Sequence, residues 1–259
     1  MNTTDLQTKI ELWHKEEREA KMRGWDFSHI EGRFYEDLAL PFSYRDEILS
    51  RLAPNMRLLD IDTGGGEFLL SLGHPAALTA ASENYAPNVE FCKDKLLPLG
   101  IDFRPGDAAA LPFEDESFDI IINRHGDVYE SELYRLLKPG GYFITEQVGS
   151  ENDRELVLLL LGPDTPIYYP DHYAYTLADK LTAAGFTVYK SAETFRTMRF
   201  FDVGALVWFA KIIEWEFRGF SVDTALERLK LADELIEKGG YVSGKTHRFL
   251  VVARKPDKK

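Results

Sequence analysis

The chain has 259 residues, of which 44% are apolar and 29% are charged, and its formal net charge is −12 at pH 7. This length and composition suit one α/β domain with an addition, or at most two domains. The negative charge argues against extended contact with nucleic acid, because such binding relies on Lys and Arg to neutralise phosphates. A small local basic patch is still compatible with it.

The single cysteine and the apolar runs narrow the class of protein further. Cys92 has no partner for an internal disulfide and is expected to be a small buried thiol. The first residues lack the basic start and apolar centre of a secretion signal. The longest apolar runs, Leu156–Leu161 and Ala205–Ala210, are too short to span a bilayer. We therefore expect a cytoplasmic protein that is not embedded in a membrane.

Residues 1–54 are interpreted as an N-terminal helical lid segment. Apolar side chains recur at roughly helical spacing over residues 5–23, which predicts a helix. An irregular aromatic stretch follows, and a helix over residues 45–52 should lead into the first strand. The candidates for contacting a substrate or covering the site are Trp25, Phe27, His29 and Arg33. Plain aromatic packing of the N-terminal helix is the alternative.

The stretch Arg57–Leu70, RLLDIDTGGGEFLL, is the most informative part of the chain. An apolar run ends in acidic residues, three glycines follow, and a helix is expected to begin at Glu67. Strand, glycine turn and helix form the nucleotide-binding unit of an open α/β sheet. Glycine lets the backbone approach a ligand with no Cβ in the way, and the ligand then meets free amides at the helix N-terminus. A nucleotide-like cofactor is therefore expected here.

The residues around the glycines indicate which cofactor this is. A P-loop requires Gly-Lys-Ser/Thr, whereas Gly66 is followed by Glu67. The dinucleotide fingerprint fits poorly, because Leu69 stands where its third glycine belongs. Asp60 and Asp62 would repel a pyrophosphate but would suit a cofactor that carries positive charge. S-adenosylmethionine carries an ammonium and a sulfonium and has no phosphate.

Predicted strands and helices alternate through residues 55–195, the predicted cofactor-binding core. Such alternation indicates a parallel sheet with right-handed crossovers. The strands are expected near residues 57–62, 78–82, 101–104, 118–122, 141–148 and 186–195. The helices are expected near residues 66–72, 87–99, 128–137 and 176–184.

Residues 196–245 are far more than the roughly 2–5 residues that a hairpin connection takes. Helices are expected over residues 203–217 and 222–238. They either pack beside the sheet or form a helical cap over the substrate, and both interpretations stay open. Residues 246–259 should supply the last core strand and a basic tail.

The segment Asp60–Gly66 resembles the D-x-G-x-G-x-G signature of class I S-adenosylmethionine-dependent methyltransferases. Further blocks are similar to this family in the same order, at residues 78–83, 106–113, 117–123 and 136–143. The resemblance covers roughly residues 55–190. Asp62 departs from it, because the family usually has glycine there. The Thr-Gly-Gly-Gly-Glu variant is similar to small bacterial methyltransferases of the type-11 kind.

The resemblance implies a Rossmann-like α/β fold. The expected sheet has seven strands, is mostly parallel with an antiparallel last strand, and carries helices on both faces. A helical cap insertion would be added to it. The cofactor would be S-adenosyl-L-methionine.

The resemblance also implies a set of cofactor-binding residues. These are Asp60, Asp62, Gly64, Gly65, Gly66, Glu83, Asn84, Asp107, Ala108, Asn123 and Arg124. Glu83 would hold the ribose hydroxyls, Asp107 the adenine amino group, and Asp60 the methionine end. Asp107 equally suits a local Asx turn. Asp62 would either bind the ammonium directly or serve as a turn carboxylate.

His125 is the candidate catalytic residue. It follows the fourth core strand, and the carboxyl ends of parallel strands line the ligand crevice. Its ordinary pKa near neutrality suits a substrate contact or a general base, and a histidine hydrogen-bonded in a loop is the alternative. Arg33 is a candidate for contacting the cofactor carboxylate. No cluster has the ligand spacing of a zinc site, so no metal is expected.

These observations favour S-adenosylmethionine-dependent methyl transfer to a small-molecule acceptor. The first alternative is an RNA or protein methyltransferase, hinted at by Arg196, Arg199, Lys211 and Arg218. The second is a non-catalytic module that binds S-adenosylmethionine, and a NAD-dependent oxidoreductase is a weak third. The sequence specifies neither the acceptor, nor the atom that is methylated, nor the oligomeric state.

Overall fold

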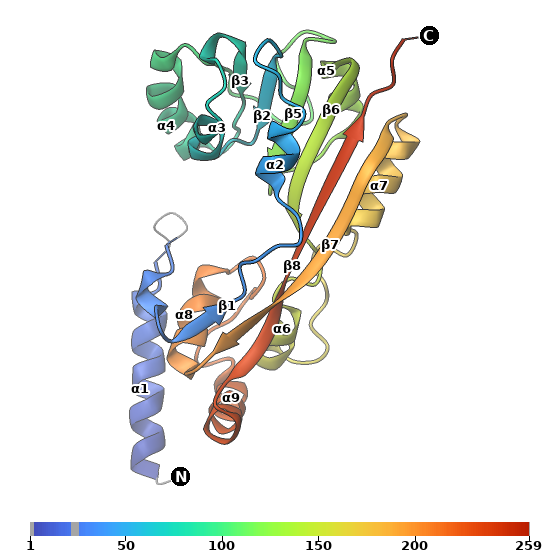
Figure 1. Cartoon of the computed structure of the whole chain (residues 1–259). Coiled ribbons are helices and arrows are strands. Elements are labelled where there is room, and N and C mark those ends of the chain that lie inside the picture. The colour runs from blue at the N-terminus through green and yellow to red at the C-terminus, as the bar shows by residue number, and fades with distance from the viewer. Residues whose placement is uncertain (1–2, 22–25, 259) are drawn as a thin grey trace. The chain divides into compact units, whose positions relative to one another are not determined.

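The computed structural model describes residues 3–21 and 26–258 (Figure 1). Trp25 lies outside the described residues. The chain divides into two compact units. Unit 1 comprises Met1–Ala39, Ser150–Pro170 and Phe195–His247, and unit 2 comprises Leu40–Gly149, Asp171–Thr194 and Arg248–Lys259.

Unit 2 contains the parallel strands and the helices that cover them. Its strands are β2 (Leu58–Ile61), β3 (Thr79–Ala81), β4 (Asp102–Phe103), β5 (Phe118–Arg124) and β6 (Leu137–Val148). Its α-helices are α2 (Tyr44–Leu49), α3 (Glu67–Ser71), α4 (Ala86–Leu96), α5 (Glu130–Leu136) and α7 (Ala174–Ala183), with short 3₁₀ turns at Ala76–Leu78 and Leu97–Leu99.

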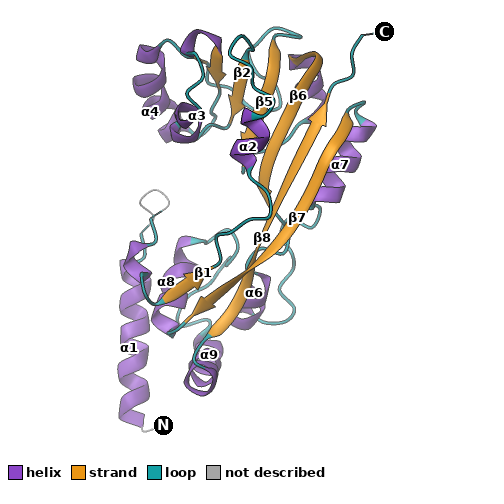
Figure 2. Ribbon diagram, viewed as in Figure 1, coloured by secondary structure: helices purple, strands orange, loops and turns teal. Residues whose placement is uncertain are grey.

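Unit 1 is built mostly from helices. They are α1 (Thr3–Glu19), α6 (Arg154–Leu161), α8 (Val203–Ile212) and α9 (Leu226–Gly239), with a 3₁₀ turn at Ser28–Ile30. The short strand β1 (Phe34–Glu36) also belongs to it. Two long strands, β7 (Thr187–Phe200) and β8 (Val242–Arg254), contribute residues to both units (Figure 2).

The strands are ordered β1-β7-β8-β6-β5-β2-β3-β4. The pairs from β6 to β4 are parallel, whereas β8 runs antiparallel to β6 and β1 antiparallel to β7. The expected fold class, a mostly parallel Rossmann-like sheet ending in an antiparallel strand, is confirmed. The strand count is corrected from seven to eight, because β1 pairs Phe34 with Phe200 at the far end of β7.

Both faces of the sheet in unit 2 are buried, which is why its strands are apolar runs. Leu59 and Ile121 face one core, which α5 completes with Leu133 and α7 with Leu181. Alternate residues such as Leu58, Ile120 and Ile122 face the other core, which α4 completes with Cys92 and Leu96. The sheet therefore carries helices on both faces, as expected.

Helix α8 forms the centre of unit 1. All of its residues except Lys211 are buried, as expected of a helix that is apolar on every side. Its N-cap is Asp202, whose carboxylate accepts a hydrogen bond from the Ala205 amide at 2.8 Å. The expected helix over residues 203–217 therefore ends earlier, at Ile212. No helix of the described residues is both long and apolar enough to cross a membrane.

Candidate cofactor site

The strand register brings the predicted site residues of unit 2 to one edge of the sheet. Ile61 in β2 lies opposite Asn123 in β5, and Asn123 lies opposite Thr145 in β6. Asp60 pairs with Ala81, the last residue of β3. The carboxyl ends of these parallel strands therefore meet where an open α/β sheet binds its ligands.

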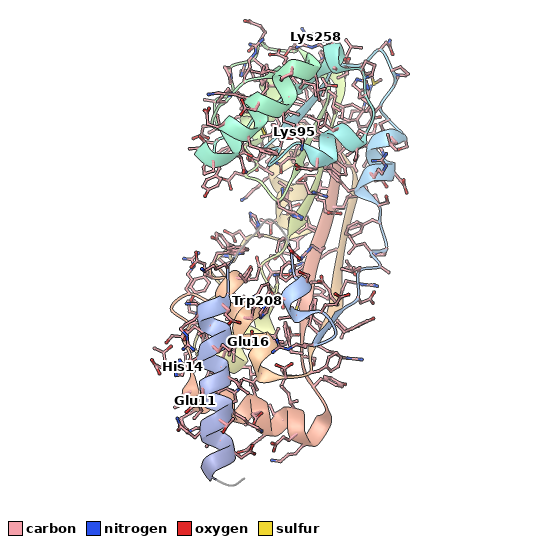
Figure 3. All side chains as sticks on the ribbon, turned by 90° about the vertical axis from the view of Figure 1, so that its left-hand side faces the viewer. Glu11, His14, Glu16, Lys95, Trp208 and Lys258 are labelled. Carbon is pink, nitrogen blue, oxygen red and sulfur yellow. The ribbon has the colours of Figure 1, made fainter. Side chains whose placement is uncertain are left out.

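The glycine loop leaves space at one position. Gly64 has a φ of +61°, and a Cβ added to it would meet no atom within 4 Å. Gly66, the N-cap residue of α3, has a φ of +73°, and a Cβ added to it would lie 2.9 Å from the Leu96 side chain. Gly65 is held at its carbonyl by the ammonium of Lys95 on α4, at 2.9 Å (Figure 3). The loop is fixed on its helix side and open at Gly64.

Glu83 fixes the other side of this loop. The side chain is 5% exposed, and its Oε2 accepts a hydrogen bond from the Gly64 amide at 2.8 Å. Its Oε1 accepts from the amides of Asn84 and Tyr85, both at 2.9 Å. A longer contact of 3.4 Å joins Oε2 to the side-chain amide of Asn88. Glu83 thus connects the end of β3 to both the glycine loop and the start of α4.

Two further carboxylates lie beside the loop in surroundings that disfavour their negative charge. Burial raises the pKa of Asp60 to about 7, even though its Oδ2 accepts a 2.6 Å hydrogen bond from Thr63. Burial, and then the charge of Glu83, raises the pKa of Asp62 to about 6. Asp62 has a φ of +55° and accepts a hydrogen bond from the Asp127 amide. Buried carboxylates near one another favour a ligand that brings positive charge.

The raised pKa of Asp60 predicts a pH-dependent stability. Between about pH 4 and pH 7 the folded protein keeps a proton on Asp60 that the unfolded chain has released, so this group makes stability fall as the pH rises. The pKa of His125 is lowered in the folded protein, so this group makes stability rise with pH over part of the same range. We therefore expect Asp60→Asn to raise the melting temperature relative to wild type more at pH 8 than at pH 5. Equal differences at both pH values would contradict this ionisation.

The residues on the adenine side make local contacts. Asp107 is exposed, and its Oδ1 accepts a hydrogen bond from the Ala109 amide at 2.9 Å. This is the Asx turn expected as the alternative, and it leaves the second carboxylate oxygen available. Ala108 is 7% exposed. Asn84 is exposed, and its backbone amide donates a hydrogen bond to Glu83.

The Asn123 side chain belongs to a buried polar network. Its Nδ2 donates to the Ile61 carbonyl at 3.2 Å, and its Oδ1 accepts from Gln147 at 2.6 Å. Gln147 also donates to the Gly126 carbonyl at 3.0 Å, and the Tyr44 hydroxyl donates to the Asn123 carbonyl at 3.1 Å. In this arrangement Asn123 fixes the strand tips relative to one another.

Arg124 and His125 follow directly and face outward. The Arg124 guanidinium lies 4.7 Å from the centre of the Phe68 ring. His125 has a φ of +63° and keeps an exposed face. Desolvation, and then the positive charges of Arg248 and Arg124, lower the pKa of His125. A lowered pKa keeps the ring neutral but makes it a weaker base than an ordinary histidine.

The predicted substrate or lid residues within the described part of the chain belong to unit 1. Phe27 packs edge-on against Trp208 with ring centres 6.0 Å apart, and His29 stacks on the same ring at 5.2 Å. Figure 3 labels Trp208 on α8 and Glu16 on α1. His29 also contacts the Glu16 carboxylate at 2.6 Å.

Arg33 is held by two carboxylates of unit 1. Its guanidinium donates to Asp202 at 2.7 and 2.9 Å and contacts Glu16 at 2.8 Å. Within residues 3–21 and 26–258, the group with metal-ligand spacing is Glu16, Glu19 and His29. Arg33 already neutralises Glu16, which leaves less negative charge in this group for a metal ion.

Sequence reasoning missed several residues at the strand tips. A Cβ at Gly126 would lie 2.4 Å from the Asp62 carboxylate and 2.6 Å from the Asn123 amide, so only glycine fits there. Gln147 is 2% exposed, and a polar residue inside an apolar predicted strand was the available indication. Tyr44 gave no such indication, because its contact depends on tertiary packing.

Comparison with known proteins agrees with this geometry. The family described as "Methyltransferase domain" matches residues 59–145. A phthiotriol/phenolphthiotriol dimycocerosates methyltransferase of Mycobacterium tuberculosis H37Rv is 40% identical over 87 residues, which are 31% of this chain and 32% of that protein. A fatty-acid O-methyltransferase of Mycolicibacterium smegmatis is 35% identical over 88 residues, with the same coverage. The chain therefore matches about a third of the length of these relatives.

Over residues 59–145, about a third of the chain, this protein is similar to the methyltransferase domain family. Solved structures with the same fold include a protein from Bacillus halodurans C-125, with a TM-score of 0.56 and 20% identity over 82% of this chain and 98% of that one. The YcgJ protein of Bacillus subtilis has a TM-score of 0.55 and 19% identity over 83% and 98%. The [4+2]-cyclase SpnF, with a TM-score of 0.51 and 21% identity over 83% and 81%, also has this methyltransferase fold. The fold by itself therefore does not fix the reaction.

Proposed function

We propose that this protein transfers a methyl group from S-adenosylmethionine to a small-molecule acceptor, in the cytoplasm. The observation that carries the proposal is the open space at Gly64, whose amide donates to Glu83, in a loop where Asp60, Asp62 and Glu83 influence one another's charge. The match of residues 59–145 to the methyltransferase domain family supports it.

The residues present fit this cofactor by the chemistry of their donors and acceptors. Asp60 and Asp62 would face its ammonium, whose charge would lower both raised pKa values. Glu83 would accept from a ribose hydroxyl in exchange for its long contact with Asn88. The free oxygen of Asp107 and the amide of Ala108 would hold the adenine.

When bound, S-adenosylmethionine supplies the electrophilic methyl carbon and the leaving sulfide. The chain's own residues contribute binding, orientation and exclusion of water, and orientation can be worth roughly 7–11 kcal/mol. A strong base is not required for such a displacement. The lowered pKa of His125 therefore suits a substrate contact better than proton abstraction.

Binding measurements test this proposal directly. We expect calorimetry to show saturable binding of S-adenosylmethionine and S-adenosylhomocysteine, with proton release below about pH 7 because Asp60 and Asp62 ionise. NAD should bind much more weakly, because the site's carboxylates repel a pyrophosphate. Tight NAD binding without S-adenosylmethionine binding would contradict the proposal.

A macromolecular acceptor is less well supported. Of the basic residues that hinted at one, Arg196 is paired with Asp37 at 2.7 Å, and Arg218 lies 4.1 Å from the centre of the Tyr168 ring. Arg199 packs against Tyr241 at 4.7 Å. Arg196 is thus paired with a carboxylate, whereas Arg199 and Arg218 keep their charge beside tyrosine rings.

A further inference from the structure

A cavity of about 190 Å³ lies within unit 2 next to the candidate cofactor site. Its buried lining comes from Gln147, Leu177 and Phe249, which are at most 9% exposed. Two links join it to the glycine loop. The side chain of Gln147 donates a hydrogen bond to Asn123. The backbone amide of Asp127, another lining residue, donates a hydrogen bond to the Asp62 carboxylate. The cavity is therefore placed to hold the acceptor of the proposed methyl transfer, and the inference rests on that proposed function.

The size of the cavity restricts the acceptor. Pockets for drug-sized ligands measure roughly 300–1,000 Å³, so 190 Å³ suits a compact molecule. A long acyl chain would not fit within this volume. The acceptor class differs on this ground from the fatty acid in the name of the Mycolicibacterium smegmatis relative.

The charged residues that line the cavity favour one sign of charge on the acceptor. The lining includes three acidic residues, Asp127, Glu130 and Asp171, against one lysine, Lys180, and one histidine, His172. The charge of Asp127 is also the main cause that raises the pKa of Tyr129, another lining residue. A carboxylate ligand would be repelled here, and a cation would be attracted.

Aromatic rings add a second preference for a cation. Tyr129 is 40% exposed, and Tyr173 is held by stacking on Tyr175 with ring centres 5.3 Å apart. Phe249, which also lines the cavity, is 1% exposed. The faces of such rings attract ammonium groups, and their apolar surface can pack against the apolar part of a ligand.

We infer that the acceptor is a compact amine with a small apolar or aromatic body, recognised as its ammonium in the cavity lined by Tyr129, Tyr173, Asp127, Glu130 and Asp171. The ammonium first releases one proton to water or to a lining carboxylate. The nitrogen lone pair then forms the new N–C bond, while the C–S bond breaks and its electron pair passes to sulfur. The net products are the N-methylated ammonium, the neutral thioether and one proton.

The experiment compares ligands that share a body and differ in one terminal group, which is an ammonium, a hydroxyl or a carboxylate. We would measure binding of tyramine, 2-(4-hydroxyphenyl)ethanol and 3-(4-hydroxyphenyl)propanoate, and of butylamine, butanol and butyrate, by ligand-observed NMR. Each series is measured with and without S-adenosylhomocysteine. The amine should bind most tightly in at least one series, and the acid should bind most weakly. An acid or alcohol that binds as well as its amine in both series, or no amine binding at millimolar concentration, would overturn the inference.

Charge variants give effects of opposite sign. Asp171→Asn and Glu130→Gln should each weaken amine binding about two- to fivefold, as expected for a partly exposed ion pair. Lys180→Gln should strengthen it by a similar factor. Failure of S-adenosylhomocysteine to bind wild type would refute the proposed function, whereas the ranking of the amines without it still decides the acceptor class. Variants that shift all six ligands equally would also overturn the inference.

Discussion

Replacement of Gly64 by alanine is expected to weaken S-adenosylmethionine binding about 10- to 100-fold, the cost of about 1–3 kcal/mol for forcing a methyl group into a fitted space. The added Cβ would project into the open space beside the glycine loop. The φ of +61° also strains any residue with a side chain, which should lower the free energy of unfolding by about 1–2 kcal/mol. Calorimetry and chemical denaturation measure the two effects separately.

Gly73 provides the matched control. Its φ is +67°, and a Cβ there would also meet no atom within 4 Å. Gly73→Ala should therefore cost the same stability while leaving cofactor binding unchanged, because Gly73 follows α3 and lies outside the loop. If both variants lost binding equally, strain rather than contact with the cofactor would explain the effect, and the site would have to be placed elsewhere.

Glu83→Ala is expected to lower both stability and cofactor affinity. The carboxylate accepts hydrogen bonds from the amides of Gly64, Asn84 and Tyr85, and its removal leaves these donors without their partner. We expect a loss of about 3 kcal/mol in the free energy of unfolding, the upper range for bonds to a charged group. Affinity should fall by about 1.5–3 kcal/mol through the lost ribose contact.

Two variants separate these contributions. Glu83→Gln keeps a side chain of the same length with one acceptor oxygen, so it should recover part of the stability. Its NH₂ group cannot accept a hydrogen bond, so the amide of Gly64 or those of Asn84 and Tyr85 would stay without their acceptor. Asn88→Ala removes only the 3.4 Å contact and should leave stability nearly unchanged. Wild-type affinity in Glu83→Ala would show that the ribose is held elsewhere.

The sequence predicted the sheet and the glycine loop because their determinants are local. The apolar run of β2, the acids at its tip and the glycines are contiguous, so spacing alone identified them. β1 was missed, since it has three residues and exists through its pairing with β7. α6 was also missed, because its six-residue apolar run, Leu156–Leu161, does not distinguish a helix from a buried strand.

For the candidate site, the sequence pattern indicated which residues follow the strands. Strand-tip positions could be read from the pattern, but the partner of each side chain could not. Asn123 was predicted to bind the cofactor, and its side chain donates to Ile61 and accepts from Gln147 in the structure. The close approach of Gly126 to Asp62 depends on how the loop after β5 meets the loop after β2, which sequence spacing does not encode.

Because strands β7 and β8 contribute residues to both units, the two units cannot be separated as contiguous fragments of the chain. The backbone passes between the units at residues 39–40, 149–150, 170–171, 194–195 and 247–248. Neither unit is therefore a contiguous fragment, and deletion of residues 196–245 would remove the end of β7 and the start of β8. A protease that cut a single linker would nick the chain without releasing either unit. The helices of unit 1 can be altered by substitution, but no single contiguous deletion removes unit 1 and leaves unit 2 intact.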